Sequence, residues 1–233
     1  MPLKISIIIP AKNEVVQLPV LLNYLNTVPG KEHIAEIIVS DGKSTDDTVR
    51  IAKLYGAKVV VNEQAGRGRQ MNAGAKITTG NILYFLHADS IPPVGFVEDI
   101  FEKINSGHVA GCYRLRFDDD HWFLKANAWF TRFNVNAVRF GDQSLFVTKT
   151  VFETIGGFRE DLIIMEDQEI IHRIRTKGKF AVIAGYVTTS ARKYRVNGIY
   201  RMQGIFFYIY FAYVLGASQQ KLVSIYKKLI RSS

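Results

Sequence analysis

Short runs of apolar, often β-branched residues alternate with amphipathic or glycine-punctuated stretches through the first part of the chain. The apolar runs, each closed by a polar or turn-forming residue, lie at 4–10, 35–39, 58–61 and 82–86. Helical spacing or helix-capping residues occur at 15–25 and 48–55, and a glycine-punctuated loop at 66–74 leads into a further helix. Four strand–helix repeats of this kind predict an α/β fold with a doubly wound, mostly parallel sheet flanked by helices.

The second part of the chain has a less regular pattern. Strands are predicted at 109–117, 144–147 and 180–183, and helices at 122–133 and 166–175. An almost wholly apolar and aromatic stretch at 205–217 and a basic amphipathic stretch at 221–231 predict two more helices. We therefore expect a main domain at 1–195 and a C-terminal helical extension at 196–233.

Aromatic residues recur at helical spacing within the predicted helix at 122–133. They are Trp122, Phe123, Trp129 and Phe130. This spacing favours packing in the core or in a dimer interface, and a sugar-stacking surface is the alternative.

The composition supports one folded domain with an extension. The chain has 233 residues, of which 48% are apolar, so a sizeable core is expected. Its single cysteine, Cys112, excludes an internal disulfide and a four-thiolate zinc site, which fits a reducing cytoplasm. We find no signal-peptide pattern and no apolar run of about 18 residues, so a spanning helix is not expected.

The net charge of +9 is concentrated at one end of the chain. Residues 170–233 contain twelve Lys and Arg and no Asp or Glu, so the preceding residues hold all 21 acids. A basic segment of this kind indicates an anionic partner, either nucleic acid or a phospholipid surface.

The C-terminal stretch at 204–217 would form a helix of about 21 Å, shorter than the bilayer core of about 30 Å. A helix lying in the membrane interface is therefore expected rather than one that crosses it. Its belt aromatics would be Phe206, Phe207, Tyr208, Tyr210 and Tyr213, and its cations Arg201, Lys221, Lys227, Lys228 and Arg231. The alternative is packing on the main domain or in a homodimer interface.

Acidic residues gather where predicted strands and loops end. Asp41 follows the second strand, Asp89 follows the fourth, and Glu166 and Asp167 open a later helix. Taken singly, each also fits a turn, a helix cap or the first turn of a helix. Ligands of open α/β sheets bind beyond the carboxyl ends of the strands, so we expect Asp41, Asp89 and Asp167 to meet at one cleft.

Common cofactor motifs are missing from the sequence. It contains no G-x-G-x-x-G after the first strand, no Walker A motif, no HExxH and no CxxC, which disfavours dehydrogenases and P-loop enzymes. A divalent cation held by Asp89 and two phosphate oxygens would use oxygen ligands that Mg²⁺ and Mn²⁺ prefer. Arg67 and Arg69, on the glycine-rich loop, are placed to contact a diphosphate, or form a solvated basic turn.

Five segments together resemble the family 2 glycosyltransferases with the GT-A, Rossmann-like fold. In order, they are Ile7 to Glu14, Val39 to Thr48, Gly66 to Gly74, Leu86-His87-Ala88-Asp89 and Met165-Glu166-Asp167. The resemblance covers residues 4–180. Gly141-Asp142-Gln143 and Ser190-Ala191-Arg192 further resemble a small bacterial subgroup that has a His-Ala-Asp metal motif.

The resemblance implies an inverting, hexosyltransferase-type enzyme. It would move a sugar from a nucleotide-diphospho-sugar, with a UDP-sugar as the first candidate, to a hydroxyl acceptor, lipid-linked acceptors included. The reaction would be a metal-assisted single displacement using Mg²⁺ or Mn²⁺. Such an enzyme would be cytoplasmic, or peripheral on the inner face of the cell membrane, and a homodimer is a further possibility.

Residue roles follow from the same resemblance. Asp167 would be the general base, and Asp89 would ligate the metal. His87 takes the first position of the metal motif, which leaves open whether it touches the metal directly, through water or not at all. The nucleotide would be bound by Pro10, Ala11, Asn13, Glu14, Asp41, Arg67, Arg69 and Ala88. Weaker candidates for binding the acceptor or the donor sugar are Glu166, Gly141, Asp142 and Gln143, although residues 141–142 also fit a simple turn.

Two other functions are each compatible with part of the sequence. A nucleotidyltransferase of similar sheet architecture usually has a glycine-rich phosphate loop directly after the first strand, and residues 11–14 contain no glycine. A non-enzymatic nucleic-acid-binding module would use the basic tail, but the tail's cations are interleaved with apolar runs and no reader motif is present. We therefore expect no nucleic-acid partner.

Overall fold

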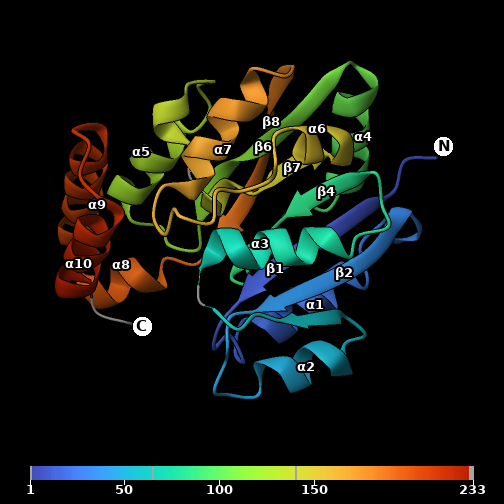
Figure 1. Cartoon of the computed structure of the whole chain (residues 1–233), viewed down its shortest axis with the longest axis horizontal. Coiled ribbons are helices and arrows are strands. Elements are labelled where there is room, and N and C mark those ends of the chain that lie inside the picture. Colours follow the sequence, from blue (N-terminus) through green and yellow to red (C-terminus); the bar gives the residue numbers. More distant parts are fainter. Residues whose placement is uncertain (1, 65, 140, 231–233) are drawn as a thin grey trace.

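A computed structural model describes residues 2–64, 66–139 and 141–230. Its centre is an eight-stranded sheet with the order β3-β2-β1-β4-β7-β6-β8-β5 (Figure 1). The first four strands are parallel: β1 (Ile5–Ala11), β2 (Ile34–Asp41), β3 (Lys58–Val61) and β4 (Ile82–Phe85). The strands predicted for the first part of the chain are confirmed, and their order brings the ends of β1 and β4 side by side.

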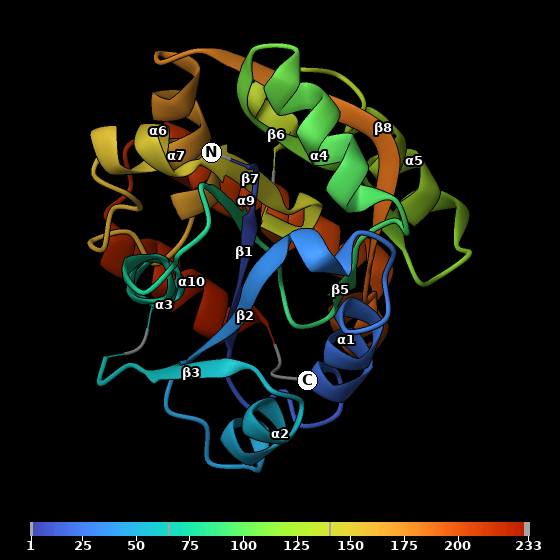
Figure 2. The ribbon, with the colours of Figure 1, turned by 90° about the vertical axis from the view of Figure 1, so that its right-hand side faces the viewer.

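The apolar runs are continuous because the central strands are buried on both faces. In β1, Ile5, Ile7 and Ile9 pack into one core cluster with α1 (Leu18–Leu25) and α4 (Phe96–Asn105). Ile8 points the other way and packs with Met71 of α3 (Arg67–Lys76). Figure 2 shows these two helical layers on either side of the strands. Helix α2 (Thr48–Leu54) covers the sheet near β3.

The second part of the chain continues the same sheet. Strand β7 (Leu145–Thr148) runs antiparallel between β4 and β6 (His108–Phe117), and β8 (Lys179–Thr189) lies parallel to β6. The short strand β5 (Ser90–Ile91) pairs antiparallel with β8. Helices α5 (Trp122–Phe130), α6 (Lys149–Thr154) and α7 (Glu166–Arg175) complete this part, with short 3-10 turns at Lys31–His33, Asn136–Val138 and Gly141–Gln143. The mostly parallel sheet is confirmed, and β7 is its main antiparallel interruption.

The C-terminal extension is helical, as predicted. It consists of α8 (Arg192–Asn197), α9 (Ile199–Val214) and α10 (Gln219–Leu229), and the expected boundary after residue 195 lies inside α8. Ile205, Ile209 and Leu222 join α9 to α10. Met202 and Tyr194 pack with Leu124 of α5, so the extension is anchored on the main domain. In the described part of the chain, no helix is both long and apolar enough to cross a membrane.

Several boundaries differ from the prediction for local reasons. Helix α1 starts at Leu18 rather than at residue 15, with Pro19 in its first turn, a position that tolerates proline. Strand β8 continues to Thr189 because it pairs with β6 along nearly its whole length. The short elements α4, α6, α8 and β5 were not predicted.

Candidate active site

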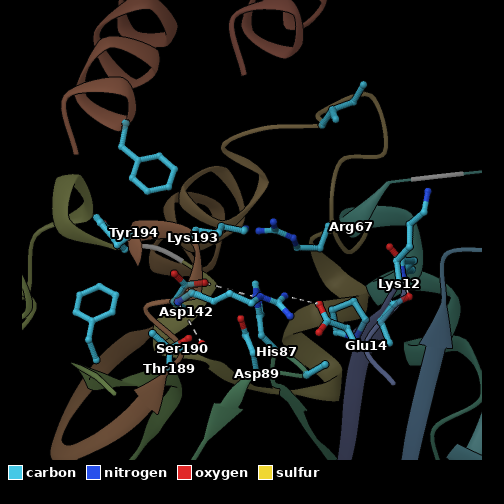
Figure 3. A pocket seen from close by; sticks show the side chains of 18 residues that line it. Lys12, Glu14, Arg67, His87, Asp89, Asp142, Thr189, Ser190, Lys193 and Tyr194 are labelled. Atoms are coloured by element: carbon cyan, nitrogen blue, oxygen red, sulfur yellow. Dashed lines mark hydrogen bonds and ion pairs between the residues drawn. The ribbon is translucent and has the colours of Figure 1, made fainter. Parts of the chain in front are cut away.

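A cavity of about 320 Å³ lies at the carboxyl ends of β1 and β4, the size of a small-molecule site (Figure 3). Its lining residues come from both parts of the chain. They are Pro10, Ala11, Lys12, Glu14, Arg67, Gln70, His87, Ala88, Asp89, Phe117, Asp142, Ile163, Thr189, Ser190, Arg192, Lys193, Tyr194 and Phe206. The location agrees with the rule for ligand binding in open α/β sheets.

The loop after β1 forms one side of the cavity. Asn13 adopts a left-handed backbone conformation with φ of 55°, and its Oδ1 accepts a hydrogen bond of 2.8 Å from the Thr45 amide. The Glu14 amide donates to Thr48 Oγ1 at 2.9 Å. These bonds fix the loop, so that Lys12 and Glu14 line the cavity while Asn13 supports the loop from outside it.

Glu14 lies partly buried between strand β1 and the C-terminal helices. Its Oε1 lies 3.4 Å from Arg192 Nη2, and its Oε2 is buried without a hydrogen-bond partner among the described residues. Burial raises the pKa of Glu14, although the Arg192 guanidinium counters part of that effect. The unpartnered oxygen points to a polar ligand group at this edge of the cavity.

Asp41 does not line the cavity. Its carboxylate is 1% exposed and accepts hydrogen bonds from the Ser44 amide at 3.0 Å and from the Ser44 hydroxyl at 2.5 Å. Gln70 Nε2, on the cavity side, donates to the carbonyls of Ala11 and Ser40 and so joins the ends of β1 and β2. The expected meeting of three acids is therefore incomplete: Asp89 lies at the cavity, and Asp41 holds a turn behind it.

His87, Ala88 and Asp89 follow β4 and form the floor of the cavity. Burial, together with the nearby Asp142 carboxylate, raises the pKa of Asp89. His87 Nδ1 lies 3.5 Å from Asp142 Oδ1. Burial and the positive charge of Arg67 lower the pKa of His87 to about 4, so its imidazole is neutral near pH 7. The Asp89 carbonyl accepts a hydrogen bond of 3.2 Å from the Ser190 amide, which ties this turn to the end of β8.

Asp167 lines a small second cavity beside the first, and His87 lines both. The carboxylate belongs to the first turn of α7, where negative charge is favoured by the helix dipole. Arg67 Nη1 lies 3.4 Å from Glu166 Oε1 and 3.7 Å from Asp167 Oδ2. Burial and the neighbouring Glu166 raise the pKa of Asp167 to about 8, even though Arg67 acts in the opposite direction.

Gly141 packs directly against the side chains of Asp167 and His87. A Cβ atom at this position would lie 2.3 Å from Asp167 Oδ2 and 2.9 Å from His87 Nε2. Any side chain would therefore push these two groups apart. The turn at Gly141–Gln143 is consequently part of the site, and Asp142 lines the main cavity.

The donor set suits a divalent cation only when a phosphate ligand completes it. No cluster of three or more His, Cys, Asp or Glu residues arranged for a metal occurs within residues 2–64, 66–139 and 141–230. Asp89 presents a carboxylate at the cavity floor, and Asp142 and Glu14 line the same cavity. Mg²⁺ is commonly held by one or two carboxylates together with substrate phosphates, and the residues present fit that pattern.

Three further predicted residues do not line the main cavity. Gln143 is 1% exposed and its Nε2 donates to the Tyr113 carbonyl at 3.1 Å, and its role in sugar binding stays a prediction. Arg69 lies outside both cavities, and its Nε donates to the Glu160 carbonyl at 3.4 Å. Glu166 is buried, and it pairs with Arg67, which lines the main cavity.

Core packing is wrong for three of the four aromatic residues of α5, whereas packing in a dimer interface stays a prediction. Trp122 is 65% exposed, Trp129 and Phe130 are about half exposed, and Phe123 is half-buried. Their helical spacing places them on a solvent-facing side, whereas Leu124 is the residue of α5 that packs inward.

The extension supplies cavity residues that the sequence patterns did not identify. Lys193 and Tyr194 come from α8, and Phe206 comes from α9, where its ring contacts Tyr194 at 6.0 Å between centroids. Asp118, after β6, accepts from the Ala191 amide at 2.6 Å and pairs with Arg195, which positions α8 over the cavity. Only the Ser190-Ala191-Arg192 segment gave a signal in the sequence.

Comparisons with known proteins agree on one family. A model described as "Glycosyl transferase family 2" matches residues 6–163. An uncharacterized glycosyltransferase of Mycobacterium tuberculosis is 29% identical over 103 residues, which are 44% of this chain and 44% of that protein. The undecaprenyl-phosphate 4-deoxy-4-formamido-L-arabinose transferase of Klebsiella pneumoniae is 30% identical over 140 residues, covering 55% of this chain and 42% of that protein. The matches thus span less than half the length of these relatives.

Solved structures share the fold at low sequence identity. S. aureus TarS in complex with UDP-GlcNAc superposes with a TM-score of 0.69 and 19% identity, covering 81% of this chain and 58% of that one. The mannosyltransferase PcManGT from Pyrobaculum calidifontis, in complex with GDP-Man and Mn²⁺, gives a TM-score of 0.66 and 16% identity, covering 79% and 56%.

Proposed function

The chain belongs to glycosyl transferase family 2, and from this we propose that it transfers a sugar from a nucleotide-diphospho-sugar to a hydroxyl acceptor, with inversion at the anomeric carbon. Its curled, mostly parallel sheet flanked by helices matches the GT-A glycosyltransferases. The observation that carries the proposal is a pair of adjoining cavities joined at His87. One holds Asp89 with the cations Arg67, Arg192 and Lys193, and the other holds Asp167, which lies 3.7 Å from Arg67.

The donor would occupy the side of the cavity formed by β1 and β4. Pro10, Ala11 and Glu14 line the nucleoside end, and the diphosphate would lie between Asp89 and the positive charges of Arg192 and Lys193. A UDP-sugar is the first candidate, since TarS was solved with UDP-GlcNAc, although PcManGT was solved with GDP-Man. Asp89 would hold Mg²⁺ or Mn²⁺ together with phosphate oxygens, and the cation would neutralise charge on the departing diphosphate.

Asp167 would act as the general base. Its carboxylate takes the proton of the acceptor hydroxyl, whose oxygen attacks the anomeric carbon. The bond from that carbon to the diphosphate oxygen breaks on the opposite face. The raised pKa of about 8 gives Asp167 a basicity suited to proton transfer near neutral pH, and Arg67 keeps part of its population ionised. One base is sufficient for a single displacement.

The acceptor would approach along the apolar residues of the cavity lining. Phe117 and Phe206 each contact the ring of Tyr194, and the cationic Lys193 precedes Tyr194 in the same lining. An apolar surface beside a positive charge suits an acceptor with a phosphate headgroup and a hydrocarbon chain. The Klebsiella relative is named for transfer to undecaprenyl phosphate, which supports a lipid-linked acceptor and a peripheral position at a membrane.

The test is a calorimetric screen of nucleotide-sugars with and without Mn²⁺. We expect one donor to bind at least about tenfold more tightly with the metal, and Asp89→Asn to lose that gain, since a carboxylate ligand is worth more than one unit of log affinity. Asp120→Asn, which changes a fully exposed acid, is the matched control. Absence of binding by every nucleotide-sugar would refute the proposal, and release of pyrophosphate from a nucleoside triphosphate and a sugar phosphate would indicate a nucleotidyltransferase.

A further inference from the structure

Helix α9 presents an apolar face to solvent. Tyr200, Phe207, Phe211 and Leu215 are all more than half exposed, and Leu215 reaches 85%. Their spacing of seven, four and four residues places them on one side of the helix. The opposite side carries Ile205 and Ile209, which pack on α10. The exposed face is therefore not the one that the fold uses to hold α9 in place.

Helix α5 extends this exposed face. Trp122, Trp129 and Phe130 of α5 are exposed, and Trp122 lies 6.5 Å from Tyr200 between ring centroids. Phe123 is closer still to Tyr200, at 4.9 Å. We call the exposed aromatic residues of α5 and α9 the aromatic surface. Contiguous apolar surfaces of this extent usually mark a contact with a partner or a membrane.

The charged residues of α9 and α10 are all positive. Helices α9 and α10 contain no acidic residue, and Arg201, Lys221, Lys227 and Lys228 are exposed on them. The acids at the start of α5 are already paired: Asp120 with Lys125 at 2.7 Å, and Asp118 and Asp119 with Arg195. The extension therefore combines an exposed aromatic face with exposed cations and no acid, which complements anionic phospholipid headgroups.

The aromatic surface continues into the cavity. Phe206 lines the cavity, and its neighbour Phe207 belongs to the exposed face of α9. A hydrocarbon chain on the aromatic surface would thus lie one residue along α9 from the cavity lining. Helix α9, with sixteen residues, is about 24 Å long and too short to span the bilayer core.

We propose that the aromatic surface of α5 and α9 lies in the interfacial layer of an anionic phospholipid bilayer, with α9 along the membrane plane. The bilayer then delivers a lipid-linked acceptor past Phe206 to the cavity, a step that rests on the proposed function. Membrane binding by the surface does not depend on the sugar transfer.

Cosedimentation with vesicles tests the proposal. The vesicles are phosphatidylcholine alone, or phosphatidylcholine and phosphatidylglycerol in equal parts. We expect the full chain to bind the anionic vesicles, and Phe207→Ser with Phe211→Ser to lower binding by about tenfold or more. Val16→Ser with Val20→Ser, at a similarly exposed pair near α1, should leave binding unchanged. Lys227→Gln with Lys228→Gln should lower binding only to the anionic vesicles, by about fivefold per lysine.

Three results would overturn the proposal. They are no vesicle binding by the unmodified chain, equal loss in both serine pairs, or a dimer that dissociates only in the Phe207 and Phe211 variant, which would make the surface a contact between copies. Nucleotide-sugar binding, measured on the same samples by calorimetry, reports on the catalytic proposal separately. A chain that binds vesicles but no nucleotide-sugar would retain the membrane surface and lose the proposed function.

Discussion

Residues 10–14 and 87–89 reach the cavity from the ends of two neighbouring parallel strands, whereas residues 189–206 reach it from one long strand and the two helices beyond it. We call these the strand wall and the arm wall. The strand wall rests on β1, whose isoleucines are fully buried. The arm wall is held by the small cluster around Leu124 and Met202 and by the polar contacts of Asp118. Local sequence thus builds one wall, and long-range contacts place the other.

The two walls also differ in the charges that they contribute to the cavity. The strand wall contributes the acids Glu14 and Asp89 together with Lys12, whereas the arm wall contributes the cations Arg192 and Lys193. Asp167, on α7, belongs to neither wall and meets the cavity through His87. The acids of the cavity lining that could hold a metal therefore lie outside the arm wall.

The largest expected effect concerns the base that lies between the walls. Asp167→Asn should lower sugar transfer by about 10² to 10⁴-fold, because the amide cannot accept the acceptor's proton. Nucleotide binding, followed by calorimetry, should persist, since both walls remain intact. Asp161→Asn, an exposed acid in the loop before α7, should retain full activity. An active Asp167→Asn enzyme would remove Asp167 from the role of base.

A smaller effect should show whether the arm wall contributes to binding of the nucleotide-sugar donor. Lys193→Gln should weaken binding of a nucleoside diphosphate by about tenfold, the usual loss for a hydrogen bond to a charged group. Lys177→Gln, at an exposed lysine after α7, is the matched control for calorimetry. Unchanged diphosphate binding, with a higher KM for the acceptor alone, would assign Lys193 to the acceptor and divide the donor and acceptor between the walls.

The smallest effect is a shift in pH dependence. Asp167 accepts a proton only when ionised, so transfer should rise with pH up to the pKa of about 8. Arg67 lowers that pKa, and Arg67→Gln should move the rising limb upward by about one pH unit. Arg69→Gln should leave the pH dependence of transfer unchanged, because Arg69 lies outside both cavities. Equal shifts in the two variants would show that general charge, and not the contact with Asp167, sets the profile.

Sequence periodicity was sufficient for most of the strand wall. Fully apolar runs such as 4–10 identify strands buried on both faces, and polar residues directly after them identify the ligand edge. The predicted bounds of α7, with acids in its first turn, also agree with the structure. The roles assigned to Asp89 and Asp167 remain predictions, although the structure brings both to adjoining cavities.

The periodicity of apolar residues could not show which side of a helix is buried against the rest of the protein. Trp122 and Trp129 share one side of α5, but whether that side packs inward depends on partners far along the chain. The same limit applies to Gln143, which turns toward the Tyr113 carbonyl, and to Asp118, whose partners Ala191 and Arg195 are more than seventy residues away. Pairings at such separations leave no local pattern to recognise.

The hydrogen bond from the Ser190 amide to the Asp89 carbonyl, with the adjacent pairing of β5 and β8, has a mechanical consequence. Ser190 lies two residues before α8, so this bond joins the backbone that carries Asp89 to the backbone that leads into α8. Any displacement of the start of α8 therefore either moves the Asp89 backbone as well or breaks the bond.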